Sequence, residues 1–284
     1  MPVKTKAFHK ILRHWYWLAG GILLLCAVVL LTVELQKVDT VTPATTDPTT
    51  ASTAPTLPQP PFNPLQPGDF AFREDYLACL TAPSVLGIDV SEWQTQVDWQ
   101  QVKAAGVEFV MLRAGWRGSE QGVLTVDTCA QSHYEGAAAA GLKVGVYFFS
   151  QSISPAEAVE EANFLLGIIK DWNLSMPVVY DWEYISADSR TGNMDARTLT
   201  DCAKAFCDTV AAAGYEPMVY FNTSQSFDLL YLQELTDYKF WLAQYRNALE
   251  YPYRVDMWQY TNTGSVPGID GNVDINLFFP WEDA

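Results

Sequence analysis

Two acidic residues, Asp181 and Glu183, stand two positions apart at the end of the apolar segment 177–180. The segment has the length and β-branched character of a buried strand, and a proline is tolerated at its first residue. Because side chains alternate along a strand, both carboxylates should project to one side and Trp182 to the other. Two carboxylates held close together do not titrate independently, and the more desolvated one keeps its proton to higher pH. A protonated acid beside an ionised partner is what cleavage of a glycosidic bond requires.

Histidine offers little alternative acid–base chemistry in this sequence. Of the three histidines, His9 and His14 lie in a basic N-terminal stretch, which leaves His133 for the rest of the chain. A histidine-based zinc site or a Ser-His-Asp triad would have to be built around that residue. His133 falls within an expected helix, where we expect it to pack or lie at the surface. Carboxylates are therefore the expected acid–base groups.

The charge of the chain argues against nucleic acid as a partner. The 284 residues include 17 Lys and Arg and 33 Asp and Glu, for a net charge of −16. The first fourteen residues hold four of the basic side chains and no acid, so the remainder carries 13 basic and 33 acidic residues. Nucleic-acid binding depends on clustered Lys and Arg that neutralise phosphates. An anionic polymer would instead be recognised through its neutral sugars.

Residues 15–33 are expected to cross a membrane. They are 19 residues without a charge, follow a basic stretch and begin with the aromatic residues Trp15, Tyr16 and Trp17. This length spans a bilayer, and the basic flank places the N-terminus in the cytoplasm. A cleaved signal peptide fits less well, because the run is longer than a usual signal core and no small-x-small site follows it. We expect an uncleaved, single-pass signal anchor.

The segment after the anchor is rich in Thr and Pro, has too few apolar residues for a core and should be extended. The expected organisation is a basic cytoplasmic tail at 1–14, a transmembrane signal anchor at 15–33, a linker at 34–69, a pre-barrel segment at 70–84 and an α/β domain at 85–284. Four cysteines lie beyond the anchor, and an oxidising exterior leaves room for one or two disulfides, whose pairing stays open. They are Cys79, Cys129, Cys202 and Cys207.

From residue 85 onward, apolar strand-like runs alternate with amphipathic helical segments. The expected strands are 86–90, 109–113, 143–149, 177–180, 218–221, 240–245, 256–260 and 273–278. Helices are expected near 98–105, 128–140, 154–170, 198–214 and 224–235, and the last three strands are too close together for crossover helices. Five βα units followed by three strands predict an α/β fold that closes as an irregular TIM-like barrel. Such a barrel carries its site at the C-terminal ends of the strands.

Acids and aromatics gather at these expected strand ends. Asp89 ends the first strand, Asp181 and Glu183 end the fourth, and Asp274 lies on the eighth. Other residues at strand ends are candidate substrate contacts: Tyr147, Tyr220, Gln244 and Trp258. If the strands close into a barrel, these side chains converge on one rim. Packing within the barrel is the competing role for each of the four contacts.

Several motifs occur in order at the expected strands. They are Gly87-Ile88-Asp89-Val90-Ser91, Tyr180-Asp181-Trp182-Glu183, Trp258-Gln259-Tyr260-Thr261 and Val266-Pro267-Gly268-Ile269-Asp270-Gly271-Asn272-Val273-Asp274-Ile275-Asn276. With them the sequence resembles glycoside hydrolase family 25, muramidases (lysozymes) of an irregular barrel fold, over residues 85–279. Arg117 and the 115–124 loop match less clearly, and their role stays open.

The resemblance implies hydrolysis of the β-1,4 bond between N-acetylmuramic acid and N-acetylglucosamine in peptidoglycan, with retention of configuration. Glu183 would be the general acid and base, and Asp181 would stabilise positive charge on the sugar, either as nucleophile or by orienting the substrate's acetamido group. Asp89 and Asp274 would be supporting carboxylates. The resemblance calls for no metal or cofactor. The domain would face the cell wall from the outer side of the membrane.

Two other classes of function remain as alternatives. One is a module that binds peptidoglycan without cutting it, although the four carboxylates do not favour it. The other is a different enzyme acting on the same polymer, such as an acetylhexosaminidase or an esterase. Wall-modification preference, oligomeric state and biological role, whether remodelling, autolysis or secretion, stay open from the sequence.

Overall fold

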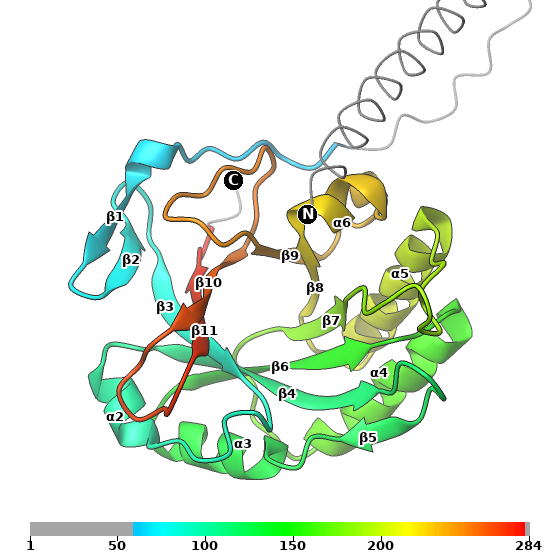
Figure 1. The fold of residues 1–284 in the computed structure, drawn as a ribbon, viewed down its shortest axis with the longest axis horizontal. Helices are drawn as coiled ribbons and strands as arrows, with labels where there is room; N and C mark the ends of the chain where they lie inside the picture. Colours follow the sequence, from blue (N-terminus) through cyan, green and yellow to red (C-terminus); the bar gives the residue numbers. More distant parts are fainter. Residues whose placement is uncertain (1–58, 282–284) are drawn as a thin grey trace, which may run out of the picture. The chain divides into compact units, whose positions relative to one another are not determined.

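The computed structural model describes residues 59–281, and its main sheet is a closed eight-stranded barrel (Figure 1). The barrel strands are β3 (Val85–Val90), β4 (Phe109–Arg117), β6 (Lys143–Ser150), β7 (Val178–Trp182), β8 (Pro217–Asn222), β9 (Lys239–Ala243), β10 (Met257–Gly264) and β11 (Val273–Phe278). The sheet closes because β3 pairs with both β4 and β11. The expected barrel with eight strands is confirmed.

A helix follows each of the first five barrel strands and none separates the last three. These helices are α2 (Trp99–Ala104), α3 (Ala130–Ala139), α4 (Pro155–Ile169), α5 (Ala196–Ala212) and α6 (Thr223–Asp228). The helix expected at 224–235 is shorter, and a 3-10 turn, η2 (Leu232–Glu234), follows it. Between them the Tyr231 backbone N–H donates to the Thr200 hydroxyl on α5, which draws the chain out of the helical path.

Strand direction is the main feature that the sequence pattern did not predict. Neighbouring strands from β3 through β4, β6, β7, β8 and β9 to β10 are parallel, whereas β11 is antiparallel to both β10 and β3. Only eight residues separate β10 from β11. A short connection suffices for an antiparallel pair but not for a parallel crossover. The start of β11 therefore lies at the same rim as the ends of the other strands.

A short strand, β5 (Leu124–Val126), pairs antiparallel with the end of β4 and forms a hairpin with it. This hairpin accounts for the 115–124 loop. Arg117 at its base is buried and pairs with Glu161 on α4 at 2.7 Å and with Glu160 at 2.6 Å. Arg117 thus ties the hairpin to the helix layer.

The segment before the barrel covers the outer face of β10. Its hairpin, β1 (Phe70–Arg73) and β2 (Tyr76–Cys79), places the Phe70 ring edge-on against Trp258, with centroids 5.1 Å apart. The expected packing of residues 70–84 onto the domain is confirmed. Residues 59–69, expected within the linker, also touch the domain: Phe62 forms a β-bridge with Tyr253, and Leu65 is buried. The apolar Phe62 and Leu65 at the end of this proline-rich stretch explain the contact.

The expected tail at 1–14, the expected anchor at 15–33 and residues 34–58 lie outside the described residues. Within 59–281, no helix is both long and apolar enough to cross a membrane. The four cysteines of the described part, Cys79, Cys129, Cys202 and Cys207, are free thiols. His133 packs edge-on against Trp99 and contacts the Gln94 carbonyl through Nε2 at 2.9 Å, as expected for a packing role.

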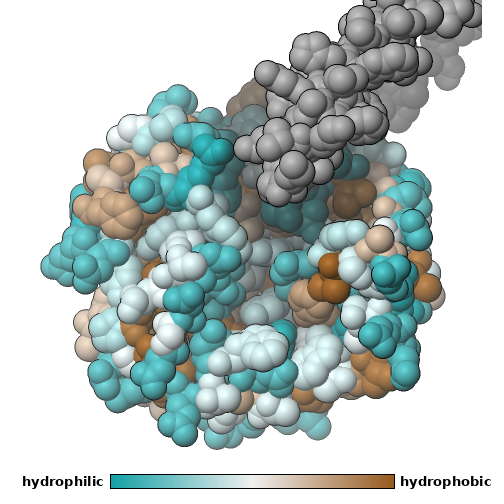
Figure 2. All heavy atoms as spheres, viewed as in Figure 1, coloured by the Kyte–Doolittle hydropathy of each residue, from teal (hydrophilic) through white to brown (hydrophobic). Residues whose placement is uncertain are grey.

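Inward-facing side chains divide the barrel interior into an apolar floor and a polar upper layer. The floor includes Phe109, Met111, Val179, Met218 and Met257. Gly87 leaves space for the Phe109 ring, which would meet any Cβ at that position. Positions i and i+2 of a strand share a face, and two residues after Met111, Val179, Met218 and Met257 the inward side chains are polar: Arg113, Asp181, Tyr220 and Gln259. Figure 2 shows an outer face that is mostly hydrophilic, with small and separate apolar patches.

Candidate active site

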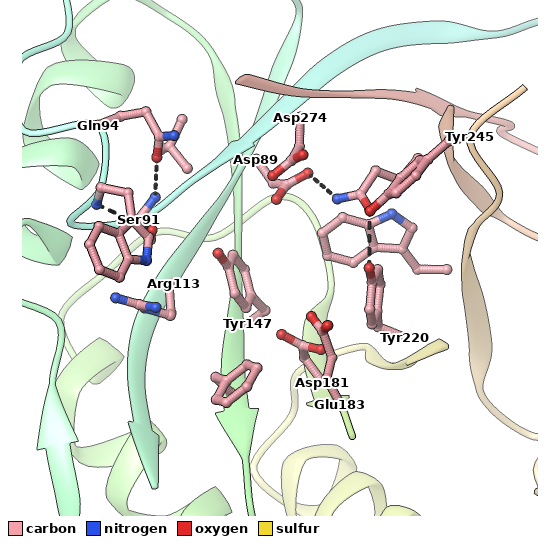
Figure 3. Close-up of a pocket in the computed structure, with 15 residues that line it drawn as sticks. Asp89, Ser91, Gln94, Arg113, Tyr147, Asp181, Glu183, Tyr220, Tyr245 and Asp274 are labelled. Atoms are coloured by element: carbon pink, nitrogen blue, oxygen red, sulfur yellow. Dashed lines mark hydrogen bonds between the residues drawn. The ribbon is translucent and has the colours of Figure 1, made fainter. Parts of the chain in front are cut away.

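The polar upper layer opens as a cavity at the C-terminal ends of the parallel strands (Figure 3). Residues from β3, β4, β6, β7, β8, β9, β10 and β11 and from nearby loops line it: Asp89, Val90, Ser91, Trp93, Gln94, Arg113, Tyr147, Phe149, Asp181, Glu183, Tyr220, Trp241, Tyr245, Gln259 and Asp274. All four carboxylates expected at the strand ends are among them. Figure 3 shows these carboxyl groups as two pairs, Asp89 with Asp274 and Asp181 with Glu183.

Asp181 and Glu183 reach the cavity from the end of β7. Trp182 between them points away and is buried in the outer core, as the alternation along the strand predicts. Burial raises the pKa of Asp181 well above its usual range, and the charges of Glu183 and Asp89 add to that rise. Burial also raises the pKa of Glu183, again with a contribution from Asp89. Asp181 is the more deeply buried of the two.

One oxygen of Asp181 lacks a hydrogen-bond partner within residues 59–281. Its Oδ1 is buried and accepts no hydrogen bond from the described residues. A buried acceptor without a donor is costly, and native structures usually supply one. Since Asp181 lines the cavity, a donor or a positive charge on a bound molecule could fill this position.

Asp89 and Asp274 form the second pair. Asp89 Oδ2 accepts hydrogen bonds from Gln259 Nε2 and Asn276 Nδ2, both at 2.8 Å. Burial raises the pKa of Asp89 to about 6, while these two amides act in the opposite direction. Burial and the neighbouring Asp89 raise the pKa of Asp274 to about 8. Near neutral pH the proton of this pair therefore resides on Asp274, and Asp89 is the ionised acceptor.

A polar network orients the two amides that hold Asp89. Gln259 Oε1 accepts from the hydroxyls of Tyr220 and Tyr245, both at 3.1 Å. Asn276 Oδ1 accepts from the Trp241 indole N–H at 2.8 Å. Each amide oxygen faces a donor, so each NH₂ group is directed to Asp89. The network therefore fixes the position of Asp89 from two sides.

Arg113 is the one cationic side chain among the residues that line the cavity. It pairs with Asp127 at 2.8 Å and Glu92 at 3.1 Å, and its guanidinium lies 4.7 Å from the centre of the Trp116 ring. Its positive charge lowers the pKa of Asp181, against the stronger effect of burial. Arg113 thus offsets part of the negative potential of the carboxylates.

Two of the four expected substrate contacts, Tyr147 and Tyr220, line the cavity, and the other two do not. Trp258 is fully buried on the outer side of β10, where its indole N–H donates to the Gln244 carbonyl at 2.7 Å. The Gln244 side chain is occupied by the backbone of Glu250, whose N–H donates to it at 2.8 Å. Gln244 and Trp258 are therefore corrected to structural roles, because their polar groups and surfaces are used within the protein.

The inward neighbour of Trp258 is Gln259, which sequence reasoning did not single out as a functional residue. Asn276 was missed in the same way, although it stands two residues after Asp274 and must share its face. The period-two alternation from Asp274 was the available signal for Asn276. For β10 no comparable signal exists, because Trp258 and Gln259 are both buried.

Two aromatic side chains stand exposed where the cavity meets solvent. The Trp93 side chain is 79% exposed and that of Tyr245 is 52% exposed, and both line the cavity. Large amphipathic rings of this kind combine an apolar face with a polar edge. Together with the carboxylates and amides below them, they suit a ligand that has both hydroxyl groups and flat apolar faces, such as a sugar chain.

Comparisons with known proteins agree with this geometry. A family model described as "Glycosyl hydrolases family 25" matches residues 88–269. The autolytic lysozyme of Clostridium acetobutylicum is 29% identical over 196 residues, which cover 68% of this chain and 55% of that protein. The autolysin LytC of Streptococcus pneumoniae, solved with a synthetic peptidoglycan ligand, is 28% identical, with a TM-score of 0.61, and the match covers 69% of this chain and 47% of LytC.

A family 25 glycosyl hydrolase of Bacillus anthracis shares the fold, with a TM-score of 0.59 at 19% identity over 70% of this chain and 90% of that one. The chain spans only about half the length of the first two relatives. The family model's range, 88–269, takes in the barrel from β3 to β10 and stops before β11.

Proposed function

The chain belongs to glycosyl hydrolase family 25, and we propose that it hydrolyses the β-1,4 bond between N-acetylmuramic acid and N-acetylglucosamine in peptidoglycan, with retention of configuration. The observation that carries this proposal is the meeting of Asp181 and Glu183 with Asp89 and Asp274 in one cavity. Retaining glycosidases use two carboxyl groups, one to protonate the leaving oxygen and one to stabilise the sugar cation. The relatives named as lysozyme and autolysin support the same substrate.

Glu183 is the proposed general acid and base. Its pKa is raised by burial and by Asp89, so it keeps its proton to higher pH than an exposed glutamate does. It is also less buried than Asp181, which suits a group that must reach the glycosidic oxygen and later a water molecule. The same residue would then remove a proton from that water, as retaining hydrolysis requires.

Asp181 is the proposed stabiliser of the positive charge that develops on the sugar. Its buried, unpaired Oδ1 supports this role, because a cationic ring or an acetamido N–H would supply the missing partner. Burial and the charges of Glu183 and Asp89 favour its protonated form. A positive charge in the cavity favours the ionised form instead, so the stabilising interaction strengthens as the transition state is reached.

The two routes open to Asp181 differ in which atom attacks the anomeric carbon. In one, an Asp181 oxygen forms a bond to that carbon as the bond to the leaving oxygen breaks, and water later displaces the carboxylate. In the other, the carbonyl oxygen of the substrate's acetamido group attacks as the bond to the leaving oxygen breaks, and Asp181 accepts a hydrogen bond from the acetamido N–H. Water later attacks the anomeric carbon and releases the acetamido oxygen. Both give retention, and the trapping experiment in the Discussion separates them.

The remaining residues of the cavity have supporting roles in this proposal. Asp89, held by two amides, and Asp274, which carries the proton of that pair, hold the sugar and tune the charge around Glu183. Tyr147 and Tyr220 are proposed to contact the glycan from the cavity walls, and Trp93 and Tyr245 to stack on sugar rings at its mouth.

We also propose that the domain acts outside the cytoplasmic membrane. The support is in the sequence, where a basic stretch precedes the uncharged residues 15–33 and a Thr- and Pro-rich segment follows. A single-pass anchor with this orientation would present the barrel to the cell wall. Protease added to intact, wall-stripped cells should remove the barrel while a fragment containing residues 1–14 stays with the membrane; a barrel protected from protease would contradict this placement.

Digestion of purified peptidoglycan by residues 59–284 tests the proposed activity. The products are reduced, hydrolysed and analysed for the new reducing end. Reduced muramic acid supports a muramidase, whereas reduced glucosamine identifies a different glycosidase of the same polymer. Binding of the polymer with no new reducing ends would identify a non-catalytic binding module.

A further inference from the structure

The carboxylate of Glu183 sits just beyond the hydrogen-bonded part of its strand. On one side, β7 pairs with β6 as far as Trp182 opposite Ser150. On the other side, β7 pairs with β8 only as far as Asp181 opposite Tyr220. Glu183 itself lies beyond the paired residues on both sides. An acid that must meet a glycosidic oxygen within hydrogen-bond distance needs support for its backbone.

Gln151 supplies it on the side of β6. Its amide Nε2 donates to the carbonyl of Glu183 at 2.9 Å and to that of Ser150 at 2.8 Å. Its amide oxygen accepts from the Thr191 hydroxyl at 2.7 Å, which directs the NH₂ group to β7. The side chain is completely buried. Gln151 thus extends the β6–β7 pairing by one residue, with a side chain in place of a strand.

The residue after β6 is itself fixed on both sides of its backbone. The N–H of Gln151 donates to Glu161 Oε1 at 3.3 Å, and its carbonyl accepts from Arg190 Nη1 at 2.7 Å. Arg190 also pairs with Glu157 on α4 at 2.8 Å. Gln151 is therefore anchored to α4 and to the loop that follows β7, and it transmits that anchoring to Glu183.

Gln225 supplies the equivalent contact on the side of β8. Its Nε2 donates to the carbonyl of Trp182 at 3.0 Å. Its amide oxygen accepts from the Asn222 N–H at 2.8 Å, within the capping box that starts α6. Consecutive carbonyls of a strand point to opposite sides, so the carbonyls of Trp182 and Glu183 are held by different neighbours.

We propose that Gln151 and Gln225 are positioning residues that hold the end of β7 from both sides and set the Glu183 carboxyl group for proton transfer. The inference rests on the proposed function, in which Glu183 is the general acid. Neither glutamine is among the residues that line the cavity, and each would act through the backbone of β7. Losing one contact lets the strand end shift, which displaces the acid without removing it.

The test uses Gln151→Met and Gln225→Met, which keep the side-chain length and remove the amide. We expect kcat on peptidoglycan to fall by about tenfold to a hundredfold with KM within twofold, because small misplacements of a reacting group cost rate rather than binding. We also expect the basic limb of the pH profile of kcat to move to lower pH, as a freed Glu183 gains contact with water. If the two glutamines only stabilised the fold, the folded variants would keep the wild-type kcat, and the basic limb of the pH profile would stay at the wild-type pH.

Gln131→Met is the matched control. Gln131 accepts a hydrogen bond from the Trp172 indole N–H at 3.1 Å, on helix α3 away from the cavity. Its loss should leave kcat and the pH profile unchanged, whatever its effect on the melting temperature. If Gln151→Met does not fold, Thr191→Val keeps the glutamine but frees its amide, and it should lower kcat in the same direction.

The outcomes separate this inference from the proposed function. If wild type releases no new reducing ends from peptidoglycan, the proposed function fails, and if Glu183→Gln retains wild-type hydrolysis, Glu183 is not the general acid. If Glu183→Gln is inactive while folded Gln151→Met and Gln225→Met keep kcat within twofold and the same pH profile, the positioning role alone is wrong. Adding Gln225→Met to Glu183→Gln should not lower the residual rate further, since the acid whose position it controls is already absent.

Discussion

Asp89 and Asp274 stand directly opposite each other on the antiparallel strands β3 and β11. Directly paired residues of an antiparallel sheet project to the same face, with Cβ atoms about 4.5–5.5 Å apart, and like charges in such a pair are destabilising. Gln259 and Asn276 both donate to Asp89, which stabilises its ionised form. Asp274 has no such donors among the described residues. A proton on Asp274 therefore removes the repulsion between the two carboxylates.

This pair should make the stability of the domain depend on pH. Burial and Asp89 raise the pKa of Asp274 from 3.8 to about 8, so the folded state binds this proton more tightly than the unfolded chain does. The resulting contribution to stability is complete below pH 3.8 and is lost as the pH rises through about 8. Asp274→Asn removes this pH-dependent loss of stability, because the amide does not ionise. Its melting temperature should match wild type near pH 4 and exceed it at pH 8 by several degrees, at about 2–4 °C per kcal/mol.

Thermal unfolding from pH 4 to pH 9 measures this effect. Asp171→Asn, at a side chain that is 84% exposed, is the matched control and should show no such trend. An Asp274→Asn variant that is less stable than wild type at pH 8 would mean that the ionised pair is favourable.

Asp89 should also set the pH range of activity. Burial and the charge of Asp89 raise the pKa of Glu183 above 4.5, so the basic limb of the kcat/KM profile should lie above that pH. Asp89→Asn removes the charge, and we expect the limb to move to lower pH while the maximal rate also falls. The profile is measured with soluble glycan fragments, and Asp237→Asn at the surface is the control. An unmoved limb would show that Asp89 does not act on the acid.

Glu183→Gln should abolish hydrolysis while leaving the fold and glycan binding nearly intact. General acid–base groups contribute about 10²–10⁴-fold to rates, and the amide cannot donate a proton as a carboxylic acid does. We expect kcat to fall by at least about 10²-fold, with the melting temperature and the affinity for glycan fragments close to wild type. Glu108→Gln, an exposed residue just before β4 at the other end of the barrel, should be fully active.

A trapping experiment with Asp181 separates the two routes to retention. A 2-fluoro glycoside with a good leaving group forms a stable ester if Asp181 is the nucleophile, and mass spectrometry would find that sugar on Asp181. If the acetamido group attacks, the 2-fluoro sugar leaves no adduct and a thiazoline analogue of the sugar inhibits tightly. Under either route Asp181→Asn should lower kcat by at least about 10²-fold, because the neutral amide stabilises the sugar cation poorly.

Trp258 should matter for stability and not for catalysis. Trp258→Phe loses the hydrogen bond to the Gln244 carbonyl and part of the packing against Phe70, at a cost of about 1–3 kcal/mol. Its kcat and KM should stay within twofold of wild type at temperatures where it is folded. Tyr220→Phe is the contrasting variant, since it removes a donor to Gln259 within the cavity and should change kinetics more than stability. A raised KM in Trp258→Phe would restore the glycan-contact role.

Local patterns in the sequence determined several features of this protein. The period of two along β7 places Asp181 and Glu183 on one face and Trp182 on the other, whatever surrounds the strand. The spacing of apolar runs determined five βα units and three further strands, because a crossover helix needs a minimum length of chain. From these alone follow the barrel, the rim that carries the site, and three of its four carboxylates.

The tertiary structure decided which residues complete the site. Asp274 is the second residue of β11, so on a parallel strand it would lie at the opposite end of the barrel from Glu183. The antiparallel direction of β11 places it opposite Asp89, and direction depends on pairing with strands remote in the sequence. Both faces of β10 are buried, so the sequence pattern does not show which of Trp258 and Gln259 faces inward. In the structure the hairpin of residues 70–79 packs over Trp258, and Gln259 faces the barrel interior. Contacts of this kind are long-range, so no local periodicity contains them.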